Sequence, residues 1–214
     1  MLSEKCEYTS VSQGGGEKRP KALALLSGGL DSILAVKLIL DQGVKVEAVN
    51  FVTPFCLCDR CYVNKFSEKL DIKVHTIFLG QEFLEIVTAP PHGYGRQMNP
   101  CLDCRILMFK KAKELAERIG ADFFVTGEVL DERPFSQKEK TMLLIEKEAG
   151  LVGKVLRPLS ANLLPESDPE REGSVKREKL LAIRGRRRIP QMELAKKLGC
   201  LLYTSDAADE EDSV

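Results

Sequence analysis

The sequence predicts an α/β fold built on one doubly wound, mostly parallel, five-stranded sheet. Short apolar runs that are typical of buried strands alternate with longer segments in which apolar residues recur at helical spacing. The first apolar run also ends at a tight glycine turn that leads into a helical segment, as in sheets that bind nucleotides. With 43% hydrophobic and 30% charged residues, the 214-residue chain is long enough for one such domain and a small appendage.

Composition also bounds where the protein works. No apolar run reaches the roughly 20 residues that a membrane-spanning helix needs, and residues 1–20 lack the apolar centre of a signal peptide. We therefore expect a soluble, cytoplasmic protein. We expect residues 1–20 to form a flexible N-terminal segment, residues 21–165 the main domain, and residues 166–199 a basic helical segment that begins a truncated C-terminal region.

Strand, turn and helix follow one another in residues 21–40. The apolar run Ala22–Leu26 stops at a serine and two glycines, and a helical pattern begins at Leu30. Glycines in such a turn can adopt positive φ and let the backbone approach a ligand, while the amides of the helix start favour a phosphate. The carboxylate of Asp31 could hold the Mg²⁺ that accompanies a nucleotide, or cap the helix. The candidate residues are Ser27, Gly28, Gly29, Asp31 and Ser32.

The motif SGGLDS, residues 27–32, lacks the lysine of the common P-loop. It resembles the SGGxDS signature of the PP-loop ATP pyrophosphatases, which are grouped with the adenine nucleotide alpha hydrolases. Members of that superfamily adenylate a substrate and release pyrophosphate. The resemblance implies a Rossmann-like, HUP-type domain over residues 21–165, a catalytic role for Asp31, and ATP and Mg²⁺ as cofactors.

The valine-rich, alternating segment Val44–Val52 is predicted to be the second strand. A helix between two parallel strands makes the βαβ unit of a doubly wound sheet. The resemblance places the adenine near the end of this strand, at Asn50 and Phe51.

Three cysteines, Cys56, Cys58 and Cys61, come directly after the second strand, at the edge where open α/β sheets bind ligands. Their spacing allows them to face one metal ion, but a zinc site normally uses four ligands. Three interpretations stay open: a structural Zn²⁺ to which Cys101 or Cys104 contributes, an iron–sulfur cluster such as 4Fe–4S, and reduced thiols that bind nothing.

The next elements are a helix over about Asp59–Leu70, a strand over Lys73–Leu79 and a helix over about Gln81–Thr88. His75 lies inside the strand, where a packed or surface histidine is more common than a ligand. His92 lies in a turn-rich loop, and both an exposed position and a functional role are open.

A long amphipathic helix follows, with apolar residues at helical spacing over Ile106–Ile119. Cys101 and Cys104 lie at its start, where the helix dipole and the nearby Arg96 and Arg105 stabilise a thiolate. We therefore predict a reactive Cys101. The segment NPCLDCR resembles the NPCxxC segment of the tRNA thiouridine synthases, PP-loop tRNA sulfurtransferases of the ThiI and MnmA type that exchange a uridine oxygen for sulfur. The resemblance implies catalytic roles for both cysteines.

The fourth strand is expected over Ala121–Val129, and it contains Gly127 and Glu128 at its end. The resemblance places ATP contacts at Gly127. It also likens Glu128, Arg133 and Gln137 to a segment that closes over the nucleotide. A solvated helix start is the alternative for Arg133.

After a further helix, Lys154–Pro165 is expected to form a short fifth strand and a loop that carries Arg157 and Ser160. In the family this loop usually reaches back to the active site. The segment 166–199 then gathers positive charge, most densely at Arg184 and at 186–188, which is typical of contact with an RNA backbone. A solvated basic face is the alternative.

The last fifteen residues, 200–214, contain acids but no base. CLLYTSDAADE resembles the translated end of a sequencing adapter, so we expect residues 200–214 to be an artefactual, disordered tail. A genuine acidic tail is the alternative.

Together these features predict an enzyme that thiolates tRNA. ATP adenylates a uridine carbonyl oxygen, and sulfur from a persulfide carrier or free sulfide then replaces AMP through a cysteine persulfide or an iron–sulfur cluster. One alternative is an amidotransferase-type PP-loop ligase with a non-RNA substrate, which needs no clustered thiols. The other is a non-catalytic, metal-binding RNA module.

Overall fold

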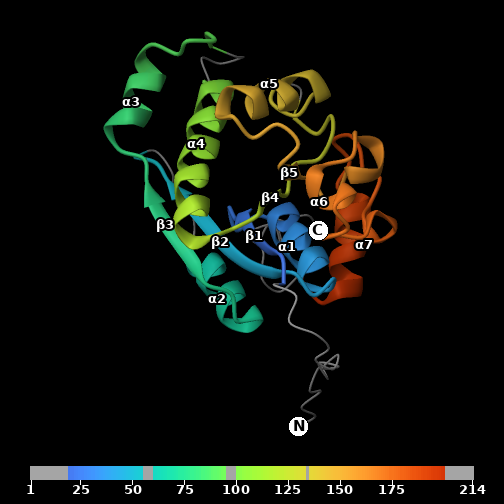
Figure 1. Ribbon diagram of the computed structural model, residues 1–214. Coiled ribbons are helices and arrows are strands. Elements are labelled where there is room, and N and C mark those ends of the chain that lie inside the picture. The colour runs from blue at the N-terminus through green and yellow to red at the C-terminus, as the bar shows by residue number, and fades with distance from the viewer. Residues whose placement is uncertain (1–18, 55–59, 95–99, 134, 201–214) are drawn as a thin grey trace, which may run out of the picture.

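The computed structural model describes residues 19–54, 60–94, 100–133 and 135–200. One sheet of five parallel strands, in the order β3-β2-β1-β4-β5, runs through the molecule (Figure 1). The predicted doubly wound sheet is therefore confirmed. The strands are β1 Lys21–Leu25, β2 Lys45–Val52, β3 Val74–Phe78, β4 Phe123–Thr126 and β5 Val155–Leu156.

Helices follow or precede the strands where the helical spacing of apolar residues predicts them. Within the segment Lys154–Pro165, predicted to hold the fifth strand and a loop, β5 covers only Val155–Leu156, and the buried Arg157 follows directly. The helices are α1 Leu30–Leu40, α2 Arg60–Leu70, α3 Gln81–Thr88, α4 Cys101–Ile119, α5 Glu139–Ala149, α6 Asp168–Arg171 and α7 Ile189–Leu198, with 3₁₀ turns η2 Ala161–Leu163 and η3 Arg177–Lys179.

The sheet separates two apolar cores. Ala22 and Ala24 of β1 face the core that α1, α2 and α7 cover, whereas Leu23 and Leu25 face the core that α3, α4 and α5 cover. Alternate residues of one strand are thus buried on opposite faces, which explains why the strand reads as an unbroken apolar run.

The strand order reverses direction at β1, which pairs with β2 on one side and with β4 on the other. The helix that follows β1 covers one face, and the helix that precedes β4 covers the other. Such a switch point opens a crevice at the carboxyl ends of the strands. The SGGLDS motif lies there, between β1 and α1.

The C-terminal segment returns to this part of the sheet. Arg184 forms an isolated parallel bridge with Leu130, and α7 packs beside α1 (Figure 1). Cys200, which we expected to begin the artefactual tail, is buried in the α1 core; residues 201–214 and the N-terminal residues 1–18 lie outside the described part of the chain. Among the described helices, none is long and apolar enough to cross a membrane.

Candidate active site

The SGGLDS motif forms a sharp turn between β1 and α1, which we call the phosphate turn (residues 27–32). Gly28 has φ of +87°, a conformation that favours glycine, whereas Gly29 has φ of −73°. The Ser32 hydroxyl donates to the Gly29 carbonyl at 2.7 Å and lies 3.3 Å from the Ser27 hydroxyl. The N-cap of α1 is Gly29, which has no side chain with which to satisfy the amides of the first turn. The turn therefore has the features of an anion-binding helix start.

Gly127 brings the end of β4 against the phosphate turn. A Cβ atom on Gly127 would lie 2.4 Å from the backbone nitrogen of Ser32 and 2.5 Å from the carbonyl carbon of Asp31. No other residue fits without displacing the backbone of α1. The predicted ATP contact of Gly127 stays a prediction, but this close approach already requires glycine.

Asn50 and Phe51, predicted to lie near the adenine, are both buried. The Asn50 amide donates to the Leu26 carbonyl at 2.8 Å, which ties the end of β2 to the end of β1. Phe51 faces the core beneath α4. Both residues lie next to the phosphate turn at the carboxyl edge, and their contact with adenine stays a prediction.

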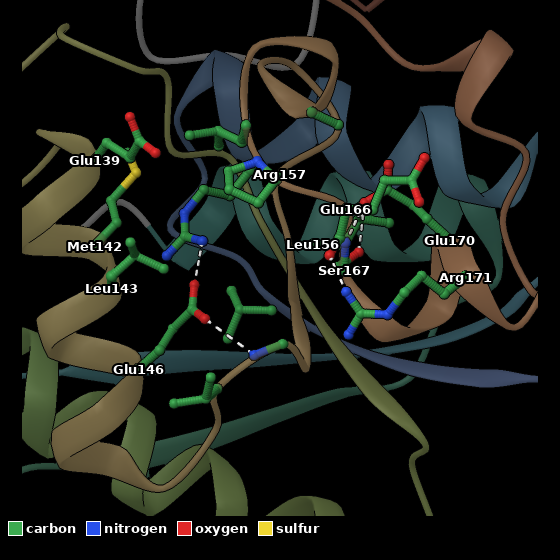
Figure 2. A pocket seen from close by; sticks show the side chains of 16 residues that line it. Glu139, Met142, Leu143, Glu146, Leu156, Arg157, Glu166, Ser167, Glu170 and Arg171 are labelled. Carbon is green, nitrogen blue, oxygen red and sulfur yellow. Dashed lines mark hydrogen bonds and ion pairs between the residues drawn. The ribbon is translucent and has the colours of Figure 1, made fainter.

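Glu128 lies beneath the edge in a buried network of charges. Its carboxylate accepts from the Arg157 Nε at 3.0 Å and lies 3.4 Å from the Arg105 Nε, and only 1% of its side chain is exposed. Burial opposes ionisation of Glu128, but Arg105 and Arg157 outweigh it and lower the pKa of the carboxyl. Arg157 also donates to Glu146 of α5 (Figure 2). Burial disfavours the Arg157 charge, yet the two glutamates raise its pKa.

Cys101 and Cys104, both partly buried, begin α4. The residue after Cys104 is Arg105, and its ion pair with Glu128 holds this helix start beside the end of β4. The structure thus brings the thiols and the phosphate turn to the same edge of the sheet. Burial raises the pKa of the Cys104 thiol, an effect that Arg105 only partly offsets. The reactivity of Cys101 stays a prediction.

His92 and Asp103 pair beside these cysteines, a contact that the sequence did not predict. The buried carboxylate of Asp103 accepts from the backbone amide of His92 at 3.1 Å and lies 2.7 Å from His92 Nδ1. The two contacts fasten the loop after α3 to the start of α4. Asp103 lies between the two cysteines of CLDC. An acidic residue in the first turn of the helix was the signal that the sequence offered for this contact.

The metal-ligand predictions fall largely outside the described residues. Cys56 and Cys58 belong to the undescribed segment 55–59, and Cys61 is the second residue of α2. Within the described ranges, His, Cys, Asp and Glu side chains form no group of three or more that could hold a metal ion. The zinc, iron–sulfur and bystander interpretations all stay open.

Gln137 is buried and shapes the loop that follows β4. Its side-chain oxygen accepts from the backbone amide of Arg133 at 2.9 Å, and its carbonyl accepts from the amide of Asp131 at 2.8 Å. The Arg133 side chain is exposed. Ser160, from the loop after β5, accepts from the Leu130 amide at 2.9 Å. These bonds support the loop, and nucleotide contacts of Arg133 and Gln137 stay predictions.

The basic C-terminal segment does not lie wholly in solvent. Arg184 pairs with Asp131 at 2.6 Å, and Arg188 Nη2 lies 3.4 Å from Asp31 Oδ2 in the phosphate turn. Arg186 and Arg187 are exposed. The sequence favoured RNA contact for this segment, with a solvated basic face as the alternative. The contact with Asp31 was not predicted, because a run of arginines carries no signal for a return to a motif far earlier in the chain.

A cavity of about 210 Å³ lies beside β5, between α5 and α6 (Figure 2). Its walls include Met142, Glu146, Arg157 and Glu170. Arg157 therefore connects this cavity with Glu128 at the edge of the sheet, while the phosphate turn is not part of its lining.

The family of the chain follows from comparison with known proteins. A family model described as Thiamine biosynthesis protein (ThiI) matches residues 17–162, more than half of the chain. The chain belongs to the ThiI family. This match covers the phosphate turn, the CxxC helix start and the loop after β4.

Curated relatives of this ThiI-family chain carry tRNA-modification names. It is 33% identical over 126 residues to the tRNA-specific 2-thiouridylase MnmA of Syntrophotalea carbinolica, covering 52% of this chain and 35% of the relative. It is 29% identical over 155 residues to MnmA of Haemophilus ducreyi, covering 66% and 40%. It is 33% identical over 117 residues to the probable tRNA sulfurtransferase of Thermotoga maritima, covering 50% and 29%. The chain thus spans well under half the length of these relatives.

Among solved structures, the chain resembles a 4-thiouridine synthetase crystallised as an RNA complex with bound ATP. The TM-score is 0.56 at 24% identity, over 84% of this chain and 51% of that one. At this identity the likeness supports the fold alone, and it agrees with the parallel five-stranded sheet.

Proposed function

We propose that this ThiI-family chain carries out ATP-dependent thiolation of tRNA. A uridine carbonyl oxygen attacks the α-phosphorus of ATP, pyrophosphate leaves, and sulfur then displaces AMP from the activated carbon. The observation that carries the proposal is a series of contacts at one sheet edge. The CxxC helix start is joined through Arg105 to Glu128, and the neighbouring Gly127 lies against the phosphate turn.

The phosphate turn suits the first step. A carbonyl oxygen is a poor leaving group, so adenylation must precede attack by sulfur. Gly28 allows the backbone to approach a phosphate, and the first turn of α1 offers amides to it. Asp31 supplies a carboxylate beside those amides, in the position where Mg²⁺ would accompany the triphosphate. When bound, Mg²⁺ would neutralise charge on the phosphates.

The cysteine pair suits the second step. In the persulfide route, the Cys101 thiolate attacks the outer sulfur of a carrier persulfide, and the carrier cysteine leaves as a thiolate. The terminal sulfur now on Cys101 then attacks the activated carbon and AMP leaves. The Cys104 thiol loses its proton and attacks Cys101 Sγ, which yields a Cys101–Cys104 disulfide and frees the thiouridine. A thiol reductant then restores both cysteines. A raised pKa of Cys104 fits this order, because a protonated second thiol does not compete for the incoming sulfur. A cluster bound by the cysteines, with a different sulfur delivery, is the alternative.

The names of the relatives support this function. They are described as thiouridylases and sulfurtransferases that act on tRNA, and the structural relative was crystallised with RNA and ATP. The exposed Arg186 and Arg187 offer positive charge for an RNA backbone. We infer a cytoplasmic tRNA as the partner of the chain, and a persulfide carrier or free sulfide as its sulfur donor.

The test is the release of AMP from ATP with and without bulk tRNA. We expect AMP only when tRNA, Mg²⁺, ATP and a sulfur donor, either sulfide or a persulfide, are all present. An amidotransferase-type ligase would give the same AMP yield without tRNA as with it, and a non-catalytic RNA module would give none under any condition. Either result would contradict the proposal.

The cysteines are tested separately. We expect Cys101→Ala and Cys104→Ala to leave ATP binding intact and to abolish the appearance of thiouridine in tRNA digests. Cys6→Ala, which removes a thiol outside the two clusters, is the matched control. Iron analysis after anaerobic purification separates the routes, since only a cluster-binding pair would lose iron on substitution. Normal thiolation by the double variant Cys101→Ala/Cys104→Ala would contradict both the persulfide route and the cluster route.

A further inference from the structure

The C-terminal basic segment is fastened to the mouth of the phosphate turn. Arg184 bridges to Leu130, and the Gly185 amide donates to the Leu130 carbonyl at 2.8 Å. The chain therefore runs beside the loop that follows β4 before α7 begins. Because these are backbone contacts, they hold the segment at this edge whatever its side chains do.

Arg188, the N-cap residue of α7, points its guanidinium at the turn. Its Nη2 lies 3.4 Å from Asp31 Oδ2, and its Nε lies 4.0 Å from Glu132 Oε1. The side chain is 39% exposed, so it has room to change partner. Arg188 is 157 residues from Asp31 along the chain, and only the packing of α7 on α1 brings them together.

Gln191 is a second polar residue on the same face of α7, since residues three apart on a helix are neighbours. It is 0% exposed, and neither atom of its amide has a hydrogen-bond partner in the described part of the protein. Leaving a buried amide without a hydrogen-bond partner is destabilising. The first turn of α7 therefore combines a cation that reaches the phosphate turn with a buried amide that has no hydrogen-bond partner in the described part of the protein.

We propose that Arg188 is a ligand of the pyrophosphate portion of ATP and exchanges Asp31 for phosphate oxygens when Mg²⁺·ATP binds. This inference rests on ATP being the nucleotide of the proposed function, but it concerns binding alone. Asp31 would hold Mg²⁺ when it is bound, and the ion would then compete with Arg188 for the carboxylate. Phosphate oxygens would offer the planar guanidinium a bidentate partner in place of Asp31.

The experiment compares the affinities of two nucleotides. Calorimetry with Mg²⁺ measures binding of a non-hydrolysable ATP analogue and of AMP to the wild type, Arg188→Ala, Arg188→Lys and Lys197→Ala. Loss of a charge-assisted hydrogen bond is worth roughly 10- to 100-fold, so we expect Arg188→Ala to weaken the analogue by that factor and to leave AMP unchanged. Arg188→Lys should recover part of the loss. Lys197→Ala removes an exposed charge from the same helix and should change neither affinity.

The direction of the change in affinity for the ATP analogue decides whether the inference holds. Tighter binding of the analogue by Arg188→Ala would show that the arginine only blocks the site, and an unchanged affinity would show that it takes no part; either result overturns the inference. An equal loss for AMP would overturn the assignment to the pyrophosphate portion. If the folded wild type bound no ATP analogue at all, the proposed function would fail together with the inference. Thermal melting of each variant checks that it is folded.

Discussion

The two edges of the sheet hold their charges in different ways. At the amino edge, Lys21, Glu47 and His75 lie on three neighbouring strands. One Glu47 oxygen lies 2.7 Å from Lys21 Nζ, and the other lies 2.7 Å from His75 Nε2. At the carboxyl edge, the partners of Asp31 and Glu128 come instead from helices and loops far along the chain.

The difference suggests a structural role for the charges at the amino edge and a chemical role for those at the carboxyl edge. Strand register holds the amino-edge triad, and each oxygen of Glu47 already has a partner. At the carboxyl edge we distinguish a buried layer, the paired charges around Glu128, from an open layer, the partly exposed pair of Asp31 and Arg188. Substitutions at the two edges should therefore change different quantities, and the following four tests run from the largest expected free-energy effect to the smallest.

A substitution in the buried layer of the carboxyl edge should lower the free energy of unfolding the most. Arg157→Met leaves Glu128 and Glu146 facing each other without their shared cation. Removing one partner of a buried ion pair costs about 3–5 kcal/mol, and urea unfolding monitored by circular dichroism should show a loss of that size. The control Arg171→Met breaks an exposed pair with Asp168 and should cost less than about 1 kcal/mol. Equal losses for the two variants would contradict the distinction between the layers.

The open layer should affect catalysis and not stability. Asp31→Ala removes a carboxylate from the phosphate turn and deletes no core volume. We expect tRNA-dependent AMP formation to fall by roughly a hundredfold or more, about 2.7 kcal/mol, with an unchanged urea midpoint. Glu47→Ala, its counterpart at the amino edge, should lower the midpoint and keep the rate per folded molecule. Normal AMP formation by Asp31→Ala would remove that residue from the site.

The contact between β4 and the phosphate turn should tolerate no side chain. Gly127→Ala places a methyl group 2.4 Å from the Ser32 nitrogen, so the two backbones must separate. Overpacking of this kind costs about 1–3 kcal/mol, and we expect ATP-analogue binding to weaken at the same time. Gly80→Ala is the control, because a Cβ there meets no atom within 4 Å. If the two variants had the same free energy of unfolding and the same affinity for the ATP analogue, the close approach at Gly127 would matter for neither stability nor binding.

The amino-edge triad should contribute stability that depends on pH. Burial opposes ionisation of Glu47, but the hydrogen bonds from His75 and Lys21 outweigh it and hold its pKa below the ordinary value of 4.5. The paired carboxylate therefore adds stability above about that pH, and the contribution is lost as pH falls through the lower pKa of the folded protein. Urea midpoints between neutral pH and pH 3 should fall less steeply for Glu47→Gln than for the wild type. Parallel curves would mean that the triad adds no pH-dependent stability.

Local patterns in the sequence were sufficient to predict much of the fold and part of the site. The five strands and the helices that flank them follow from apolar runs, glycine turns and helical spacing, all of which act over a few neighbouring residues. The position of SGGLDS after the first strand is such a local signal, and so is the helix start at Cys101. The short fifth strand was less well bounded, since a two-residue strand at the sheet edge has too few residues to show a period.

Only the tertiary structure decided which of these signals meet. The strand order places β4 next to β1, and this adjacency turns Gly127 from a residue at a strand end into the contact that closes the phosphate turn. In the same way, the packing of α7 on α1 brings Arg188 to Asp31, although a run of arginines in sequence indicates only positive charge. Such contacts join residues far apart along the chain, and their geometry comes from how the layers pack, which no local period records.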